Sequence, residues 1–186
     1  MRSIDYIDVR ARVLSTGADQ FDKLIYDELP SLLSKPWVAS YKEDQSQAEI
    51  VWIPQQSFEY LFDLKVERVL GVYGVMTGRH SGKRDSYRAQ YPFWMRSDRA
   101  GYDVGHLVQH SSRGGNDINL FLQLSGVNRG AFRSLEREAV DKDGSFYFVR
   151  LVYAAGANST DRPIKVEQGL VSPGPPTGFE VRSFAN

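Results

Sequence analysis

The stretch Gly101–Glu138 reads "GYDVGHLVQHSSRGGNDINLFLQLSGVNRGAFRSLERE", and the rest of the chain is arranged around it. It opens with an alternating segment that is typical of a strand and holds His106 in the tetrapeptide "DVGH". A Gly-rich turn follows at Gly114 and Gly115, and then an amphipathic helical pattern that begins at Asn128. We therefore predict a strand, a turn and an Asn-capped helix, with most of the reactive side chains on them.

Length and composition are those of an ordinary folded protein. The chain has 186 residues, 41% of them hydrophobic and 12% aromatic, which suits one domain or one domain with a short extra segment. It has no cysteine, which excludes disulfides and thiolate zinc sites. No apolar run approaches the ~20 residues of a membrane helix, and "MRSIDYIDVRARV" lacks the apolar segment of a signal peptide. We expect no membrane partner, and a location in the cytoplasm or delivery by a route without a signal peptide.

The formal net charge is zero, but the charges are unevenly distributed. Residues 1–65 carry 7 Lys or Arg against 11 Asp or Glu, whereas residues 66–113 carry 8 against 4. The last part, residues 114–186, is balanced at 8 against 8. A basic excess therefore runs into the stretch quoted above, as expected for contact with an anionic partner.

The chain predicts helices first. Apolar residues at helical spacing over residues 20–33 predict one or two short helices, whose extent Pro30 and Pro36 should limit. Residues 1–13 predict a short edge strand or an ordered arm. The segment "QSFEYLFDL" at residues 56–64 predicts a short helix or turn, after a buried strand at "AEIVWIP".

Strands dominate the rest. They are predicted at "KVERVLGVYGVMTG", "SFYFVRLVYAAG", "STDRPIKVEQGLV" and "FEVRSF". The fold class is therefore α+β, with a central antiparallel sheet and N-terminal helices. We divide the chain into residues 1–64, a helical segment that is either an adaptor or part of the same domain, and residues 65–186.

Three residues suggest a chemical task. A neutral imidazole at His106 can take a proton from water near a phosphate, although a lone histidine is more often without a task. Asn128 offers an amide oxygen to a metal ion, and Glu136 lies roughly 12 Å further along a continuous helix, which suits contact with water molecules of an outer shell. From spacing alone, a helix N-cap at Asn128 and a solvated glutamate at Glu136 explain these two residues better.

The combined pattern resembles the DNA/RNA non-specific endonuclease family of the ββα-metal, or His-Me finger, nucleases. That family carries "D-R-G-H", a Gly-rich turn, "N-L" followed by Pro or Leu and Gln, and "N-x-G-x-W-x-x-L-E". Here "DVGH" stands at Asp103–His106, "NLFLQ" at Asn119–Gln123 and "NRGAFRSLE" at Asn128–Glu136. The specific motifs cover residues 103–136, so the resemblance is strong there and extends only at the level of strands elsewhere.

The resemblance implies a ββα-metal finger and a role for each motif residue. His106 would be the general base, Asn128 the Mg²⁺ ligand and Glu136 a second-shell acid, while Asp103 and Asn119 would help to shape the catalytic site. Mn²⁺ or another divalent ion would substitute for Mg²⁺. The products would carry 5′-phosphate ends.

Two positions depart from the family pattern. Phe132 replaces the common Trp and keeps an aromatic ring. Val104 replaces the arginine, whose work must then come from another cation. The candidate phosphate contacts are Lys83, Arg84, Arg88, Arg113 and Arg129. The pair His106 and His110 lacks the adjacent glutamate of an H-E-x-x-H zinc protease, which excludes that class.

The sequence thus predicts a Mg²⁺-dependent endonuclease acting on double- or single-stranded DNA and on RNA, with little sequence preference. Small standalone chains of this family resemble nuclease toxin domains of bacteria, which implies a cognate immunity or inhibitor protein. The competing interpretation is a catalytically inactive nucleic-acid-binding or protein-interaction module on a nuclease-like fold, which Val104 and the zero net charge favour.

Overall fold

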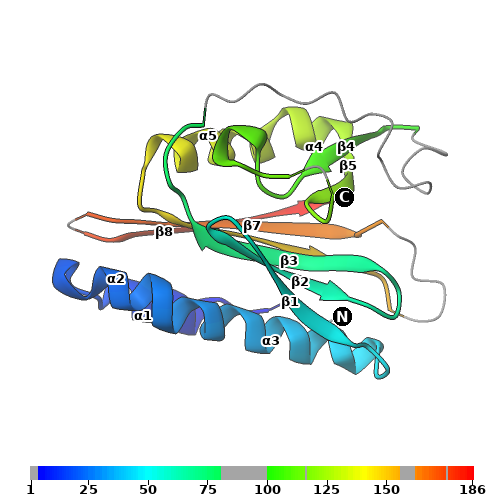
Figure 1. Ribbon diagram of the computed structural model, residues 1–186, viewed down its shortest axis with the longest axis horizontal. Helices are drawn as coiled ribbons and strands as arrows, with labels where there is room; N and C mark the ends of the chain where they lie inside the picture. The colour runs from blue at the N-terminus through cyan, green and yellow to red at the C-terminus, as the bar shows by residue number, and fades with distance from the viewer. Residues whose placement is uncertain (1–3, 81–99, 116, 156–161, 175) are drawn as a thin grey trace.

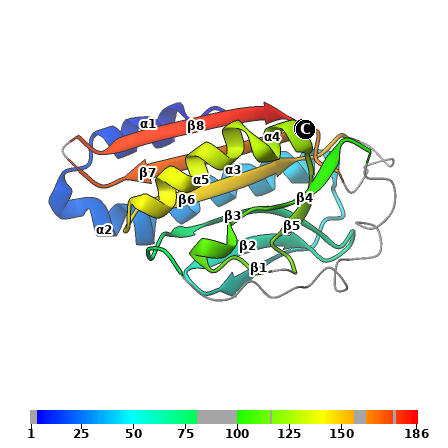
Figure 2. The ribbon, with the colours of Figure 1, turned by 90° about the horizontal axis from the view of Figure 1, so that it is seen from above.

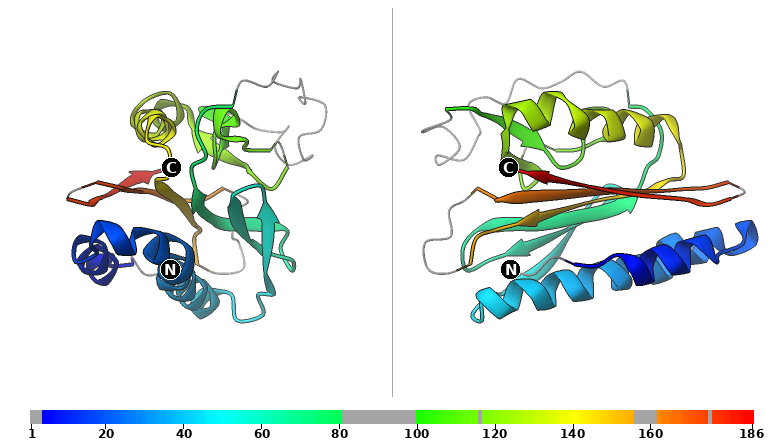
Figure 3. Two further views of the ribbon diagram at one scale, coloured as in Figure 1. Left: turned by 60° about the vertical axis from the view of Figure 1, so that its left-hand side comes forward. Right: turned by 180° about the vertical axis from the view of Figure 1, so that it is seen from behind.

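A computed structural model describes residues 4–80, 100–115, 117–155, 162–174 and 176–186. Three layers are visible in Figure 1: N-terminal helices below, one sheet in the middle, and a second helical layer with a two-stranded ribbon above. The views in Figure 3 show the same order of layers. The predicted α+β class is confirmed.

The central sheet has six strands in the order β1-β2-β3-β6-β7-β8, and every neighbouring pair is antiparallel. The bounds are β1 (Ile50–Gln55), β2 (Phe58–Asp63), β3 (Arg68–Val75), β6 (Phe146–Val152), β7 (Lys165–Ser172) and β8 (Gly178–Ala185). The strands predicted over β1, β3, β6, β7 and β8 are confirmed. β3 and β6 are buried along their whole length because both faces of the sheet are covered.

The lower layer consists of α1 (Ile7–Leu14), a 3₁₀ turn η1 (Ala18–Gln20), α2 (Phe21–Lys23), a π-helical turn η2 (Leu24–Glu28) and α3 (Leu29–Asp44). The prediction of an arm or edge strand near the N-terminus was wrong. Val9 and Val13 are the buried residues of α1 and lie one helical turn apart. None of the helices in the described ranges has the length and apolar composition to span a bilayer.

The prediction that Pro36 limits the helix was also wrong, because α3 runs for 16 residues with Pro36 inside it. Its buried residues include Leu33, Trp37 and Tyr41, which are spaced four apart and form one stripe against the sheet. Tertiary packing of this stripe outweighs the loss of one backbone hydrogen bond.

In the segment at residues 56–64, where a short helix or turn was expected, only Gln56, Ser57 and Leu64 lie in turns, and the rest is strand β2. It pairs with β1 around a two-residue turn, where Gln56 takes a positive φ of 57°. Its aromatic and β-prone residues are stabilised by pairing on both sides. The division expected at residue 64 therefore falls between two neighbouring strands of one sheet.

The upper layer holds β4 (Tyr102–His106), β5 (Leu120–Leu124), α4 (Ser125–Arg129) and α5 (Ala131–Asp141) (Figure 2). β4 and β5 form an antiparallel ribbon in which Asp103 faces Gln123 and His106 faces Leu120. The helix expected to begin at Asn128 is in fact two helices. A break at Gly130, where an added Cβ would lie 2.8 Å from the Gly126 carbonyl oxygen, separates them.

Candidate functional site

Asn119 anchors the loop that follows His106. Its side chain is fully buried and accepts hydrogen bonds from the Val108 amide (2.8 Å) and the Tyr60 hydroxyl (3.0 Å). Its amide group donates to the carbonyl oxygens of Val108 (2.7 Å) and Gly115 (2.9 Å). The bonds to Val108 and Gly115 hold the loop to Asn119, and the bond from Tyr60 attaches Asn119 to β2 of the sheet. Asn119 therefore supports the position of His106 from inside the protein.

The two glycine elements of the motif are required for close packing. An added Cβ on Gly114 would lie 1.8 Å from the Val108 carbonyl oxygen, so the Gly-rich turn cannot carry a side chain there. An added Cβ on Gly105 would lie 2.4 Å from Oε1 of Gln123 on the facing strand. The glycine of "DVGH" thus makes room for a buried glutamine.

Asp103 lies at the centre of a cluster on one side of the ribbon. Arg129 donates to both of its carboxylate oxygens, from Nε at 2.9 Å and from Nη2 at 2.8 Å. Nδ2 of Asn128 donates to Oδ2 at 3.1 Å. The hydrogen bonds from Arg129 lower the pKa of Asp103 most, and those from Asn128 and Ser125 act in the same direction. The three donors occupy positions i, i+3 and i+4 of α4 and share one helical face.

This arrangement tests whether Asn128 suits a metal ion. The Asn128 amide has one donor end and one acceptor end, and the donor end is bound to a carboxylate. The oxygen end is then directed away from Asp103 and is the end that a hard cation requires. Among the described residues no group of three His, Cys, Asp or Glu side chains is placed to hold a metal. A single amide oxygen fits Mg²⁺, which keeps several water ligands.

His106 is the last residue of β4 and is half-buried. Strand alternation places it on the opposite face of the ribbon from Asp103, and the two residues are three positions apart, roughly 10 Å along the strand. The loop bonds of Asn119 and a hydrogen bond from the Tyr147 hydroxyl to the Leu107 carbonyl oxygen (3.2 Å) fix the backbone that follows it. The imidazole is thus carried on a rigid strand end.

Glu136 is buried on α5, with 8% of its surface exposed. Burial raises its pKa to about 8, and the positive charge of Arg133 opposes the shift. The side chain of Gln109, from the loop after β4, donates to the Glu136 backbone carbonyl oxygen at 2.6 Å. Glu136 is therefore held beside the loop that follows His106, in a surrounding that favours its protonated form when no cation is near.

The cationic residues expected to contact phosphate have different surroundings. Arg113 is exposed and takes a left-handed conformation with φ of 66°, just after the 3₁₀ turn η5 (His110–Ser112). Arg129 is bound to Asp103. Lys83, Arg84 and Arg88 lie outside the described residues. Val104 packs with apolar neighbours of the ribbon, so the position of the family's arginine is part of an apolar cluster.

Sequence reasoning gave no role to Gln123 or Ser125. Gln123 is fully buried, and among the described residues neither of its amide atoms has a hydrogen-bond partner. The signal for Gln123 was its place in the "NLFLQ" motif, but its burial depends on Gly105 across the ribbon. Ser125 opens α4 and contributes to the lowered pKa of Asp103, and no local pattern singled it out.

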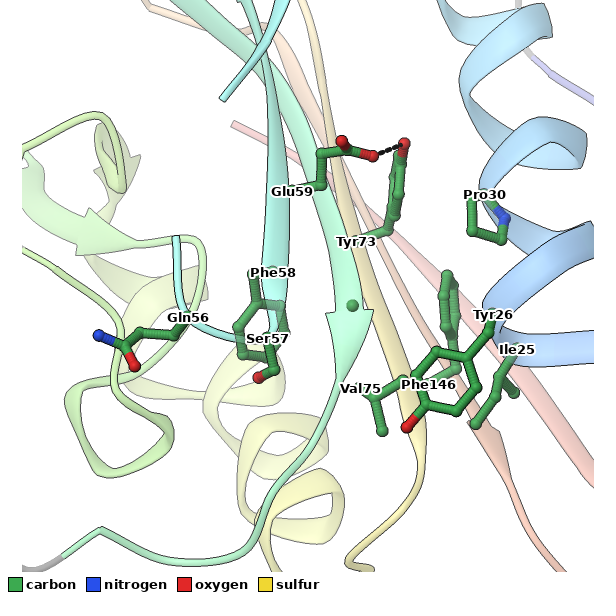
Figure 4. Close-up of a pocket in the computed structure, with 11 residues that line it drawn as sticks. Ile25, Tyr26, Pro30, Gln56, Ser57, Phe58, Glu59, Tyr73, Val75 and Phe146 are labelled. Carbon is green, nitrogen blue, oxygen red and sulfur yellow. Dashed lines mark hydrogen bonds between the residues drawn. The ribbon is translucent and has the colours of Figure 1, made fainter. Parts of the chain in front are cut away.

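A hollow on the opposite face of the sheet is separate from this cluster. Figure 4 shows it between the η2–α3 segment and strands β2 and β3, with a hydrogen bond from the Tyr73 hydroxyl to Glu59 at one end. Its volume is about 230 Å³. None of the site residues predicted from the sequence lines it. It gives no support to the predicted chemistry.

The fold and the β4–β5–α4 arrangement define a class: an α+β protein with a ββα element on one face of an antiparallel sheet. Solved structures with this fold include NucA from Streptococcus agalactiae with no metal bound, at a TM-score of 0.51 and 15% identity, covering 88% of this chain and 92% of that one. The structure of the same protein with magnesium ion bound gives a TM-score of 0.50 and 14% identity, covering 82% of this chain and 89% of that one. A chain of the EndoG/EndoGI complex gives a TM-score of 0.48 and 15% identity, covering 72% of this chain and 72% of that one.

The sequence matches no family model, and a comparison with curated proteins gives no match. The structural comparison shows that the chain has the fold of NucA, at 15% sequence identity.

Proposed function

We propose that this protein is a Mg²⁺-dependent endonuclease that hydrolyses phosphodiester bonds in DNA, and in RNA as a second substrate, with little sequence preference. The observation that carries the proposal is the hydrogen bond from the Asn128 amide nitrogen on α4 to the Asp103 carboxylate on β4 of the ββα element, which leaves the amide oxygen for a cation. The shared fold supports it, and one of the NucA structures has magnesium bound.

His106 is the proposed general base. A neutral imidazole takes a proton from a water molecule that attacks the phosphorus atom. The loop bonds of Asn119 and Tyr147 keep the strand end in place, so little reorganisation is needed when the substrate binds.

Asn128 would hold the ion through Oδ1, and Glu136 would accept hydrogen bonds from water molecules around it. When bound, Mg²⁺ supplies Lewis-acid stabilisation of the charge that develops on the phosphate and the departing 3′ oxygen. A nearby cation would favour the ionised form of Glu136, whose pKa is raised by burial in the absence of the ion.

Arg113 is the described cation that we propose for contact with the phosphate backbone, since it is exposed and follows the loop after His106. Contacts of this kind bind without reading sequence. The basic residues Lys83, Arg84 and Arg88 remain proposed contacts from the sequence. Together they would give salt-dependent binding despite a net charge of zero.

Cleavage of supercoiled plasmid tests the proposal. With Mg²⁺ the protein should convert the plasmid to open and linear forms, and EDTA should abolish this. His106→Ala should lower the rate by about 10²–10⁴-fold, the usual contribution of a general base. Arg137→Gln is the control, because Arg137 is exposed on α5 and has no role in the proposed machinery. Cleavage that is indifferent to His106 would refute the mechanism.

A second candidate function is a non-catalytic nucleic-acid-binding or protein-interaction module. The apolar packing of Val104 where the family carries arginine favours it. Salt-dependent binding of DNA without cleavage in Mg²⁺ or Mn²⁺ would support the binding module. No salt-dependent binding at all would support an interaction module.

A role as an antibacterial toxin with a cognate inhibitor protein stays a prediction from the family resemblance. Induction of the protein inside a bacterium should arrest growth, and the His106→Ala variant should not. Growth arrest by both forms would separate toxicity from the proposed cleavage.

A further inference from the structure

We propose that Arg129 and Asp103 form a clamp that sets the orientation of the Asn128 amide, which makes both of them positioning residues rather than phosphate or metal contacts. This inference rests on the proposed function, because it concerns the side chain that would hold the metal ion. It assigns to Arg129 a task different from that of the other cations near the site.

The side chain of Asn128 has two chemically different ends, an amide nitrogen that donates and an oxygen that accepts. A metal ion accepts only the amide oxygen, but an amide that is free to rotate presents either end. Nδ2 of Asn128 donates to Oδ2 of Asp103 at 3.1 Å, and a carboxylate can only accept. Rotation of the amide by half a turn would place two acceptors against each other. Asp103 therefore selects the rotamer in which the oxygen is available to a cation.

Asp103 is itself held in place by Arg129. The guanidinium of Arg129 binds both carboxylate oxygens, at 2.8 and 2.9 Å, in the bidentate geometry that fixes the plane of a carboxylate. Oδ2 accepts from both Arg129 and Asn128, so most of the acceptor sites that face α4 are occupied. Asp103 is therefore placed to orient the ligand and not to bind the ion itself.

The contact between Asp103 and α4 joins two elements that are far apart in the sequence. Asn128 and Arg129 lie on α4, and Asp103 lies 25 and 26 residues earlier on β4. The break at Gly130 ends α4 directly after the arginine, so α4 can dock on the ribbon independently of the direction of α5. The cluster is thus a contact between the two parts of the ββα element.

The side chains of Arg129 and Asp103 differ in their exposure to solvent. The side chain of Arg129 is 73% exposed, whereas that of Asp103 is 22% exposed. An exposed pair of this kind contributes little to the stability of the fold. Its effect is expected in the metal affinity, because outer partners of a ligand change affinity far more than they change folding.

The test measures binding of Mn²⁺ to the metal-free protein in the absence of nucleic acid, from the electron paramagnetic resonance signal of free Mn²⁺. Arg129→Gln should raise the Mn²⁺ dissociation constant by about tenfold to a hundredfold, the range found when partners of a metal ligand are removed. Arg129→Lys should recover only part of the affinity, because lysine keeps the charge without the fork. The matched control is Arg137→Gln, which removes an exposed arginine from α5 and should leave the dissociation constant unchanged.

Three results would overturn the clamp. One is an unchanged or tighter Mn²⁺ dissociation constant in Arg129→Gln, which would make Asp103 itself the ligand or the arginine irrelevant. Another is a salt dependence of DNA binding, measured in EDTA, whose slope falls by about 0.9 in Arg129→Gln, because that is the loss of one phosphate contact. The third is a loss of affinity explained by unfolding, which urea denaturation of the metal-free variants detects.

The Asn128→Ala variant separates failure of the clamp from failure of the proposed function. If Asn128→Ala weakens Mn²⁺ binding and Arg129→Gln does not, only the clamp is refuted. If Asn128→Ala binds Mn²⁺ as tightly as the parent protein, Asn128 is not the ligand and both proposals fall.

Discussion

The two faces of the six-stranded sheet bury polar side chains in different ways. On the face covered by the N-terminal helices, Arg150 pairs with Glu167 at 3.0 Å, and Glu167 also accepts from the Tyr6 hydroxyl at 2.7 Å. The guanidinium of Arg68 lies 4.2 Å from the ring centroid of Tyr153. Arg150 and Glu167 compensate each other within the fold, whereas Nη2 of Arg68 has no hydrogen-bond partner among the described residues. The helix face is therefore a stabilising core that contains charges.

On the face covered by the ribbon and α5, polar groups are buried with less compensation. Glu136 has a raised pKa because burial outweighs the nearby positive charge, and Gln123 has two amide atoms without partners among the described residues. Strands send successive side chains to opposite faces, which is why neighbours on β7 such as Glu167 and Gln168 serve different layers. The difference suggests that one face is built for stability and the other for a ligand.

The largest expected effect lies on the helix face. Glu167→Ala removes the partner of a buried arginine and should lower the free energy of unfolding by about 3–5 kcal/mol, because an uncompensated buried charge remains. Urea denaturation measures the loss. Glu180→Ala, which breaks an exposed pair with Arg182, should cost less than about 1 kcal/mol. A small loss in Glu167→Ala would mean that the charges of this face are not stabilised by each other.

Asn119→Ala should give the next largest effect. It removes hydrogen bonds to both the amide and the carbonyl group of Val108, and groups left unsatisfied inside a protein cost about 1–3 kcal/mol each. We expect a loss of about 2–4 kcal/mol in unfolding free energy and slower plasmid cleavage. Binding of Mn²⁺ should change little, because Asn128 lies on α4. A parallel loss of metal affinity would show that the loop and the metal ligand form one unit.

The strands and the motif order could be predicted from the sequence, because both depend on local patterns. β6 and β7 are recognisable from β-prone residues alone, and the motif residues at 103–136 stand in their expected order. The errors over α1 and α3 have a common cause. α1 and α3 are stabilised by contacts with a sheet that forms much later in the sequence, and these contacts outweigh local preferences.

The candidate site was predictable as residue types and not as contacts. No local pattern indicates that Arg129 binds Asp103, because the two are 26 residues apart and meet only when α4 docks on β4. The break at Gly130 was hidden because "NRGAFRSLE" keeps helical spacing on both sides of it. Burial of Glu136 likewise follows from the position of α5 on the sheet.

Glu136→Gln tests the ribbon face by an expected gain in the free energy of unfolding, in contrast to the two losses above. Burial raises the pKa of Glu136 to about 8 in the folded state, above the ordinary value of 4.5 that the unfolded chain should show. Between these two pH values the folded protein binds more protons than the unfolded chain. The contribution of the Glu136 carboxyl to the free energy of unfolding is therefore fully present below about pH 4.5 and is lost as the pH rises through about 8. Glu136→Gln removes this loss, by up to about 1.4 kcal/mol per pH unit.

Urea denaturation in EDTA from pH 5 to pH 9 measures the effect. The advantage of Glu136→Gln over the parent protein should grow with pH, while Glu138→Gln, two residues along the same helix and partly exposed, should follow the parent. A difference that is constant with pH would show that Glu136 does not titrate in this range.

The smallest expected effect separates two buried glutamines on the same face. Gln168 donates to the Tyr147 hydroxyl at 2.8 Å and to the Phe132 carbonyl oxygen at 3.1 Å, so Gln168→Met should cost about 1–3 kcal/mol. Gln123 makes no such bond among the described residues, and Gln123→Met should be neutral or stabilising by about 1 kcal/mol. Unfolding in urea compares the two. If Gln123→Met is instead as costly as Gln168→Met, the amide of Gln123 has a partner such as a buried water molecule. The ribbon face would then be as fully compensated as the helix face.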